Sequence, residues 1–401
     1  MDNFEAMGIF WSPKDPDKKH QGVLTHTDRQ ETTLRLAAFS SATLLDFDPI
    51  TQDLAPSETG EVIHGNTTEG QLTLLNWHKT NLTKGSGLWG SWTTETITVN
   101  EFLTGAHCNR EIQISHWTVD LEAIKEWIRI GLRELNKDYD HGETGTGEIH
   151  IGTTNPGNSD RSDEYTSDQT LATMVYNTPR GLHEARRDIS ALEQMLTIAT
   201  EVKSVPQNIR LRPAGSPQTC DYYNKPLQGS PTLYEPHSFH APLPFAAING
   251  SVGIATFLRH HHEFELPLHS MLTMQRQKST NTVSELDFLS AWMAAEFYLG
   301  TKGTNEEKLA KLTGEFCTEA EKKIVDVEAW AKAAAKSRND IVHANRQQPE
   351  PALWINSIEM LRLIVVRKIL DICDLKWTNY TTGFGHQEML SRLARTIKQL
   401  A

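Results

Sequence analysis

A short segment near the C-terminal end of the chain combines side chains that can cleave RNA. Residues 338–343 read Arg-Asn-Asp-Ile-Val-His. Arginine carries a permanent positive charge and can hold a phosphate through two parallel hydrogen bonds. Histidine accepts or donates a proton near neutral pH. Such a pair can work without a metal ion, because the imidazole can deprotonate a ribose 2′-hydroxyl while the guanidinium stabilises the charge added at the attacked phosphate.

Helix geometry limits which of these side chains can share a site. Successive helical residues are rotated by about 100°, so Asn339 and His343, four positions apart, lie on one face. Arg338 lies about 100° away, and its long side chain must bend to reach the same place. This spacing predicts that Asn339 orients the imidazole or bonds a phosphate oxygen. The Arg-x4-His spacing alone is common, and a surface ion pair with a separately bonded histidine is the simpler alternative.

Glu296 is a second ionisable candidate, because it follows the apolar run Phe288-Leu-Ser-Ala-Trp-Met-Ala-Ala. Burial of its carboxylate in a helical bundle would require a partner. Contact with Arg338 or His343 and contact with a different group both remain open from the sequence.

Other polar groups have simpler explanations. Consecutive histidines on a helix point in different directions, so we expect the histidines at 260–262 and 269 to be solvated or packed and no metal to be bound. The sequence contains no nucleotide-binding or nucleophile-elbow motif in the required context, and we expect no cofactor. Paired carboxylates can hydrolyse glycosides, although loop carboxylates are usually solvated; the candidates are Glu143, Glu148, Asp160 and Asp163.

The elements that must position residues 338–343 are the helices of a C-terminal bundle. Apolar periodicity predicts helices over 285–299, 305–316, 318–344, 352–375 and 387–400. Ser284 is a good N-cap for the first helix, and Gly300 ends it. The candidate motif then lies late in the third helix, after a run of alanines that favours helix.

The chain up to Trp117 is predicted to be β-structure, with short alternating runs separated by Gly, Asn, Asp and Pro. This spacing is typical of a sandwich or a partly open barrel. An aromatic-rich β surface could stack on sugars or bases, although core and rim positions are commoner. Six of the ten tryptophans lie here or just after: Trp11, Trp77, Trp89, Trp92, Trp117 and Trp127.

Helices are further predicted over 121–135 and 182–202, with a long loop or a hairpin around Glu148–Gly152 between them. Eight of the seventeen prolines fall between 206 and 244, which excludes a long helix there. We therefore predict an α+β protein. Its parts are a β-rich region over 1–205, a proline-rich connection over 206–244 and a helical domain over 245–401.

The charge distribution differs between the two ends of the chain. The net charge is −12, which argues against a general nucleic-acid coat protein. Residues 266–401 hold 18 basic and 16 acidic side chains, whereas residues 1–265 hold 21 and 35. Four scattered cysteines, no signal-peptide core and no apolar run of about 18 residues predict a cytoplasmic protein with reduced thiols and no membrane span.

The Arg338-Asn339-x3-His343 pattern in a C-terminal bundle resembles the HEPN ribonuclease superfamily. Its nucleases carry Arg-x4–6-His, often with a polar residue after the arginine. The helix that contains Glu296 resembles the opening helix of the ApeA-like HEPN group. The segments Gly8-Ile-Phe-Trp-Ser-Pro, Gly22-Val-Leu, Thr33-Leu-Arg-Leu and Gly105-Ala-His, with Asp120–Trp127, are similar to the N-terminal domain of ApeA-type anti-phage proteins.

This resemblance implies an abortive-infection toxin: a HEPN endoribonuclease, controlled by a β-rich N-terminal domain that senses a phage-derived trigger. It implies Arg338, Asn339 and His343 as catalytic residues, RNA as substrate, with tRNA as one candidate, and a homodimer through the HEPN domain or a larger assembly. We further expect the acidic front half to hold the cleft closed. Two alternatives are a HEPN bundle that binds RNA or assembles without cutting it, and a carbohydrate-binding or carbohydrate-active protein that uses the tryptophan-rich β domain.

Overall fold

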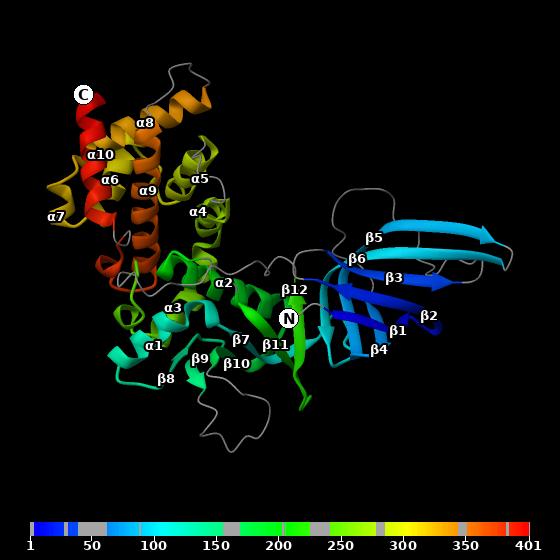
Figure 1. Cartoon of the computed structure of the whole chain (residues 1–401). Helices are drawn as coiled ribbons and strands as arrows, with labels where there is room; N and C mark the ends of the chain where they lie inside the picture. Colours follow the sequence, from blue (N-terminus) through cyan, green and yellow to red (C-terminus); the bar gives the residue numbers. More distant parts are fainter. Residues whose placement is uncertain are drawn as a thin grey trace. The chain divides into compact units, whose positions relative to one another are not determined.

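The computed structural model describes residues 4–27, 31–38, 62–87, 90–154, 169–202, 204, 206–224, 241–277, 285–343, 351–381 and 385–400. The chain forms two compact units, each built from three segments. The first contains Met1–Glu122, Thr154–Ile189 and Val205–Ser230, and the second contains Ala123–Thr153, Ser190–Ser204 and Pro231–Ala401. Figure 1 labels the elements of both units.

The first unit begins with a closed antiparallel barrel of six strands. The strand order is β3-β2-β1-β4-β5-β6, and β3 also pairs with β6, which closes the barrel. Closure gives every strand of the barrel a hydrogen-bonded neighbour on each side over part of its length. The predicted sandwich or barrel is therefore a barrel. Its strands are β1 (Phe4–Ser12), β2 (Asp15–His26), β3 (Thr32–Ala38), β4 (Ile63–Thr67), β5 (Gly70–Gly87) and β6 (Gly90–Thr104).

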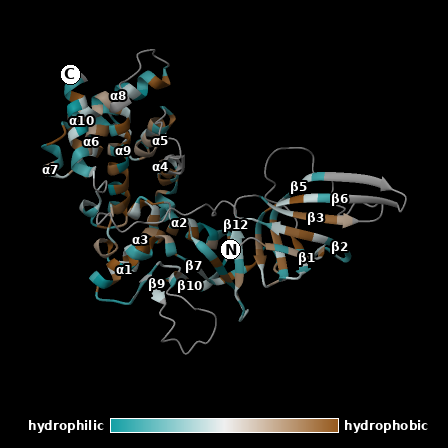
Figure 2. Ribbon diagram, in the orientation of Figure 1, coloured by the Kyte–Doolittle hydropathy of each residue, from teal (hydrophilic) through white to brown (hydrophobic). Residues whose placement is uncertain are grey.

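Alternating side chains fill the barrel interior, as the period of a β-strand requires. Phe10 is fully buried, and a Cβ atom on Gly65 would lie 2.6 Å from its ring, so the glycine makes room for the phenylalanine. In the ribbon coloured by hydropathy, brown apolar positions recur along these strands (Figure 2). The buried cluster includes Ala6, Phe10, Leu24, Leu34, Leu36, Ile63, Leu72, Leu74, Trp77, Ile97, Val99 and Phe102.

Four more strands extend this sheet from β6 in the order β12-β11-β7-β10. Two of them, β11 and β12, come from the proline-rich stretch, where Pro213 is the last residue of β11 and so interrupts no ladder. Helix α2 (Leu182–Thr200) begins in the first unit and ends in the second. The four strands are β7 (Gln113–Asp120), β10 (Gln169–Gly181), β11 (Gln207–Pro213) and β12 (Cys220–Asn224).

The second unit is mainly helical and also contains the hairpin of β8 (Tyr139–Glu143) and β9 (Gly147–Thr154). Helix α9 is its central element and packs against α5, α6, α8 and α10. The predicted bundle is therefore present, and the α+β class is confirmed. Its helices are α1 (Lys125–Glu134), α3 (Ser251–His260), α4 (Glu265–Gln277), α5 (Glu285–Glu296), α6 (Asn305–Phe316), α7 (Glu319–Lys322), α8 (Val327–Val342), α9 (Pro351–Ile372) and α10 (His386–Leu400), with short 3-10 turns at Glu122–Ile124, Ala246–Ile248, His261–Glu263 and Trp377–Asn379.

The single helix predicted over 318–344 is wrong, because the segment forms two helices. Thr318 and Glu321 form a reciprocal capping box that starts α7, which ends after one turn. The Asp326 carboxylate then accepts a hydrogen bond from the backbone N–H of Ala329 and starts α8. Helix α5 ends at Glu296, earlier than the predicted Leu299, and its predicted N-cap Ser284 lies outside the described residues.

Candidate functional site

The candidate motif lies at the C-terminal end of α8. Arg338 and Asn339 belong to its last turns, and His343 is the capping residue directly after Val342. The backbone N–H of His343 donates to the Asn339 carbonyl at 3.0 Å, which continues the helical pattern by one residue. The His343 and Asn339 side chains are exposed. The helix therefore presents the imidazole at its end, where a polymeric substrate can approach.

The Arg338 guanidinium has two neighbours within the second unit. Its Nη1 donates to the Asn339 carboxamide oxygen at 3.3 Å, and its Nη2 lies 3.8 Å from Glu296 Oε1. The Arg338 side chain is 25% exposed, and that of Glu296 is 43% exposed. Of the two partners left open for Glu296, the structure therefore selects Arg338.

The expected burial of Glu296 is wrong, because this residue ends α5 and lies on its exposed side. The buried face of α5 is formed by Phe288, Ala291, Trp292, Ala294 and Ala295. An exposed ion pair of this kind stabilises a protein by only about 0–1 kcal/mol. The Glu296 carboxylate thus fixes the direction of the guanidinium more than the stability of the fold.

Small residues let α8 approach its neighbours closely. Its buried face carries Trp330 together with Ala331, Ala334 and Ala335. The Trp330 indole N–H donates to the Ser357 hydroxyl of α9 at 3.2 Å, so the one polar atom of this large side chain is satisfied inside the bundle. The packing of α8 on α5, α6 and α9 thereby places Arg338 within reach of Glu296.

Exposed apolar side chains lie on the same helices as the motif. Leu286 and Met293 are seven residues apart on α5, which places them on one side of the helix, and Phe297 follows directly after its last residue; Met293 and Phe297 are 61% and 54% exposed. Val342, directly before His343, is also exposed. A helix face of this composition is usually covered by another surface.

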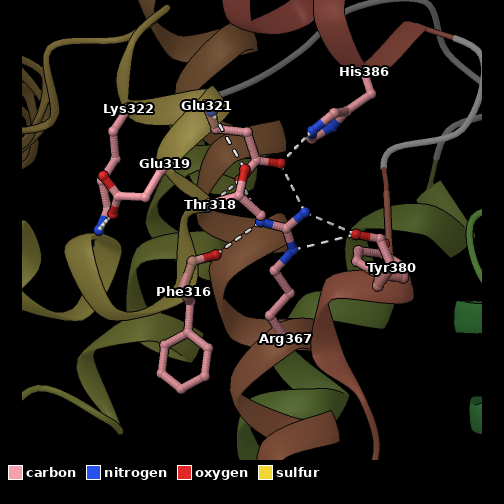
Figure 3. Close-up of polar contacts among 8 residues, drawn as sticks. All are labelled: Phe316, Thr318, Glu319, Glu321, Lys322, Arg367, Tyr380 and His386. Carbon is pink, nitrogen blue, oxygen red and sulfur yellow. Dashed lines mark hydrogen bonds and ion pairs between the residues drawn. The ribbon is translucent and has the colours of Figure 1, made fainter.

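A buried ion cluster elsewhere in the bundle escaped the sequence analysis (Figure 3). Arg367 of α9 is 1% exposed and bonds both oxygens of Glu321 at 2.7 and 2.8 Å. His386 Nε2 lies 2.6 Å from Glu321 Oε1. The guanidinium also donates to the Phe316 and Tyr380 carbonyls. The sequence contained one signal for this cluster: Arg367 lies within an apolar helix, and a buried arginine needs partners.

The charge of Glu321 is strongly favoured in this cluster. Burial alone would raise the pKa of its carboxyl, but hydrogen bonds from His386 and Arg367 and the positive charge of Arg367 outweigh that effect. The pKa of Glu321 is therefore held well below its usual range. Because the arginine donors are occupied by protein atoms, the cluster serves to join α7, α9 and the segment before α10.

In the first unit, His107 of the segment Gly105-Ala-His107 adjoins His64 of β4. The rings of His64 and His107 are stacked, with centroids 4.7 Å apart, and Trp11 meets both edge-on. His64 Nε2 bonds the Cys108 carbonyl and His107 Nε2 bonds the Gly65 carbonyl, each at 3.0 Å. The histidines thus fasten the connection after β6 to strand β4.

The remaining sequence candidates are distributed over the molecule. Trp77, Trp117 and Trp127 are core residues, whereas the side chains of Trp89 and Trp92 lie outside the described part. His261 is buried and lies 2.9 Å from Gln194, and His260 lies 2.6 Å from Glu263. Glu143 and Glu148 face each other across the β8–β9 hairpin and are exposed, while Asp160 and Asp163 are outside the described residues.

These observations define an α+β protein in which a closed β-barrel with an extended sheet precedes a helical bundle that carries an exposed Arg-Asn-x3-His motif. A family model described as ApeA N-terminal domain 1 matches residues 5–254. Because the match covers more than half of the chain, this protein belongs to the ApeA family, and that membership indicates a role in anti-phage defence.

Comparison with curated proteins and with solved structures found no match to the chain. Over the described ranges, none of the helices has the length and apolar character needed to cross a membrane.

Proposed function

We propose that this protein is a metal-independent HEPN endoribonuclease that acts in abortive infection. The observation that carries the proposal is that an imidazole and a guanidinium lie together at the C-terminal end of α8. An exposed imidazole, His343, follows an arginine whose guanidinium is held by Asn339 and lies beside Glu296. The ApeA family membership supplies the biological setting, since an abortive-infection toxin acts by destroying a component that the host needs.

In the proposed reaction, His343 removes the proton of a ribose 2′-hydroxyl, and the resulting oxygen attacks the adjacent phosphorus. Arg338 stabilises the additional negative charge of the phosphorane-like transition state. Asn339 holds Arg338 through the 3.3 Å hydrogen bond and leaves its remaining donors for the phosphate. The bond to the 5′-oxygen then breaks, and the products carry a 2′,3′-cyclic phosphate and a 5′-hydroxyl. RNA, with tRNA as a candidate, is the proposed substrate.

A homodimer completes this site in our proposal. In-line displacement benefits from a base on one side of the phosphorus and an acid on the other, whereas each chain supplies one His343. A two-fold axis near the C-terminal end of α8 would bring two copies of His343 and Arg338 into one cleft. The exposed Met293 of α5 and Phe297 directly after it support such an interface, because dimerisation would remove them from water.

The decisive experiment measures cleavage of total tRNA and of ribosomal RNA by the purified full-length protein in the presence of EDTA. We expect cleavage to persist and to be lost in His343→Ala and in Arg338→Ala. Exposed residues of the same types in the second unit provide matched controls, and His262→Ala and Arg395→Ala should keep full activity.

Circular dichroism and the melting temperature verify that each variant is folded. Full activity in a folded His343→Ala variant would exclude the proposed mechanism. If the wild-type protein retains RNA in a gel shift but yields no product after prolonged incubation, the bundle is a non-catalytic RNA-binding module.

A further inference from the structure

Two cysteines that are distant in the sequence meet inside the first unit. The thiols of Cys108 and Cys220 are neighbours, and each shifts the pKa of the other. Both are free, and their residues are 8% and 0% exposed. A pair of adjacent thiols is chemically different from a single buried thiol, because the second sulfur can trap an oxidised form of the first.

Local structure accounts for the meeting of these residues. Asp221 of β12 pairs with Thr104 at the end of β6, so Cys220 lies just beyond the last pair of that ladder. The chain after Thr104 turns at Gly105, whose φ of +90° suits glycine. A Cβ atom on Gly105 would lie 3.6 Å from the Thr219 carbonyl. The turn therefore carries the following segment back over the start of β12.

Hydrogen bonds then fix the backbone of Cys108. Its N–H donates to the Thr73 hydroxyl at 2.9 Å, and its carbonyl bonds His64 Nε2 at 3.0 Å. Cys220 is held on its side by pairing with Leu211 of β11. Neighbouring sulfurs on two anchored backbones need little movement to join.

We propose that Cys108 and Cys220 form a reversible oxidation site that a small peroxide converts to an intramolecular disulfide. The Cys108 sulfur attacks one peroxide oxygen, the O–O bond breaks, and the other oxygen leaves as water after protonation. The Cys220 sulfur then attacks the sulfenic sulfur of Cys108, the S–S bond forms, and the hydroxyl leaves as a second water. The two thiols lose two electrons and two protons, and the peroxide is reduced to water.

The order of attack follows from the surroundings of each sulfur. Cys108 is the more accessible of the two, so a small oxidant reaches it first. The neighbouring Cys220 thiol lowers the pKa of the Cys108 thiol, whereas the Cys108 thiol and burial raise the pKa of Cys220. The thiolate is the reactive form, and this difference makes Cys108 the attacking sulfur and Cys220 the resolving sulfur.

The other two cysteines provide an internal comparison. Cys317 and Cys373 of the second unit are buried, and burial raises the pKa of each thiol to about 12. Thiols with this pKa are almost entirely protonated at neutral pH and react slowly with peroxide. The protein thus carries one reactive pair and two matched thiols of low reactivity.

The test treats the reduced full-length protein with hydrogen peroxide, unfolds it and alkylates the remaining thiols before mass spectrometry. We expect a mass decrease of about 2 Da for the unalkylated chain, because two hydrogens are removed. Alkylation should be lost at Cys108 and Cys220 and retained at Cys317 and Cys373. A cross-linked peptide pair containing Cys108 and Cys220 should appear, and dithiothreitol should restore all four thiols. The wild-type chain suffices for this mapping.

Two further measurements sharpen the result. The oxidised protein should melt at a higher temperature than the reduced protein, because the cross-link closes a long loop in the unfolded chain. Cys108→Ser and Cys220→Ser should each abolish the cross-link, whereas Cys317→Ser should leave it unchanged. Four alkylatable thiols after peroxide treatment, irreversible oxidation of Cys108 alone, or disulfides only between chains would each overturn the proposal.

Discussion

Arg367 and Glu321 form a two-point ion pair inside the helical bundle, with nitrogen–oxygen distances of 2.7 and 2.8 Å. Trp377 lies against the guanidinium, whose central carbon is 5.2 Å from the ring centroid. His386 contacts the same carboxylate. Since both charges are withdrawn from water, each depends on the other for compensation.

Removal of one member of this pair should therefore destabilise the protein strongly. Glu321→Gln leaves the Arg367 charge buried without its counter-ion, and we expect a loss of about 3–5 kcal/mol in the free energy of unfolding. Urea unfolding at pH 7 provides the measurement. Glu319→Gln is the matched control, because Glu319 lies on the same short helix but contacts Lys322 on the surface. An equal effect of both substitutions would contradict the assigned role of the cluster.

The contribution of Glu321 should also depend on pH. The pKa of this carboxyl is lower in the folded protein than in the unfolded chain, where a glutamate has a pKa of about 4.3. Its stabilising effect is then complete above that value and is lost as the pH falls toward the folded-state pKa. We expect the difference in unfolding free energy between wild type and Glu321→Gln to shrink between pH 6 and pH 3. If this difference in unfolding free energy instead grew as the pH fell, the prediction that folding lowers the pKa of Glu321 would be wrong.

Substitution at Asn339 tests how Arg338 is held. A hydrogen bond to a charged group stabilises a folded structure by about 1.5–3 kcal/mol. The bond from Arg338 to the Asn339 carboxamide is partly exposed. Asn339→Ala should reduce the proposed cleavage by roughly tenfold in kcat/KM, with most of the loss in kcat, because the guanidinium acts on the transition state. Glu296→Gln, which alters the longer contact at 3.8 Å, should have a smaller effect. Unchanged kinetics in a folded Asn339→Ala variant would remove Asn339 from the site.

The proposed dimer can be disrupted through α5. Met293→Glu combined with Phe297→Glu places two negative charges on the exposed apolar side of this helix. We expect light scattering to change from dimer to monomer and cleavage to disappear, while circular dichroism remains that of the wild type. Ile130→Glu alters an exposed apolar residue of α1 and is the matched control. A double variant that remains dimeric would place the interface elsewhere.

Truncation at residue 245 should yield an unstable fragment. The second unit includes residues 123–153 and 190–204, which supply partners to the later helices. Without them, the buried Arg362 loses Glu201 at 3.1 Å, and His261 loses Gln194. We expect the 245–401 fragment to melt well below the full chain. For this reason, autoinhibition by the acidic front half is better tested in the full chain, by comparing cleavage at low and high salt. A 245–401 fragment that melts at the same temperature as the full chain would contradict the predicted instability.

Local sequence signals predicted the elements best where capping residues mark the ends. Helix α6 has the predicted bounds, because Thr304 and Glu307 form a capping box at its start. The prediction of one helix over 318–344 was wrong for two reasons. Its alanine-rich part favours helix throughout, and Asp326, which is an N-cap, was treated as an ordinary helical residue. Residue type alone rarely tells an N-cap position from a position inside a helix.

Contacts between residues that are far apart in the sequence could not be predicted from local sequence patterns. The contact between β3 and β6 and the pair Arg367–Glu321 each join residues that no local periodicity relates. For the candidate site, helical spacing predicted Asn339 and His343 on one helix face; His343 is the capping residue after α8, and its backbone N–H donates to the Asn339 carbonyl. The Arg338–Asn339 side-chain contact depends on how a long side chain bends, which spacing does not determine.

Closure of the barrel limits how a partner polypeptide can bind to it. Each of its six strands has a hydrogen-bonded neighbour on both sides over its paired residues, and β6 passes from β3 to β12 where their ladders meet. Over the described residues that are paired on both sides, a second polypeptide therefore finds no free strand edge on which to extend the sheet. A partner that binds over these stretches must instead contact side chains of the outer wall. Those side chains can be replaced without disturbing the backbone hydrogen bonds between the strands.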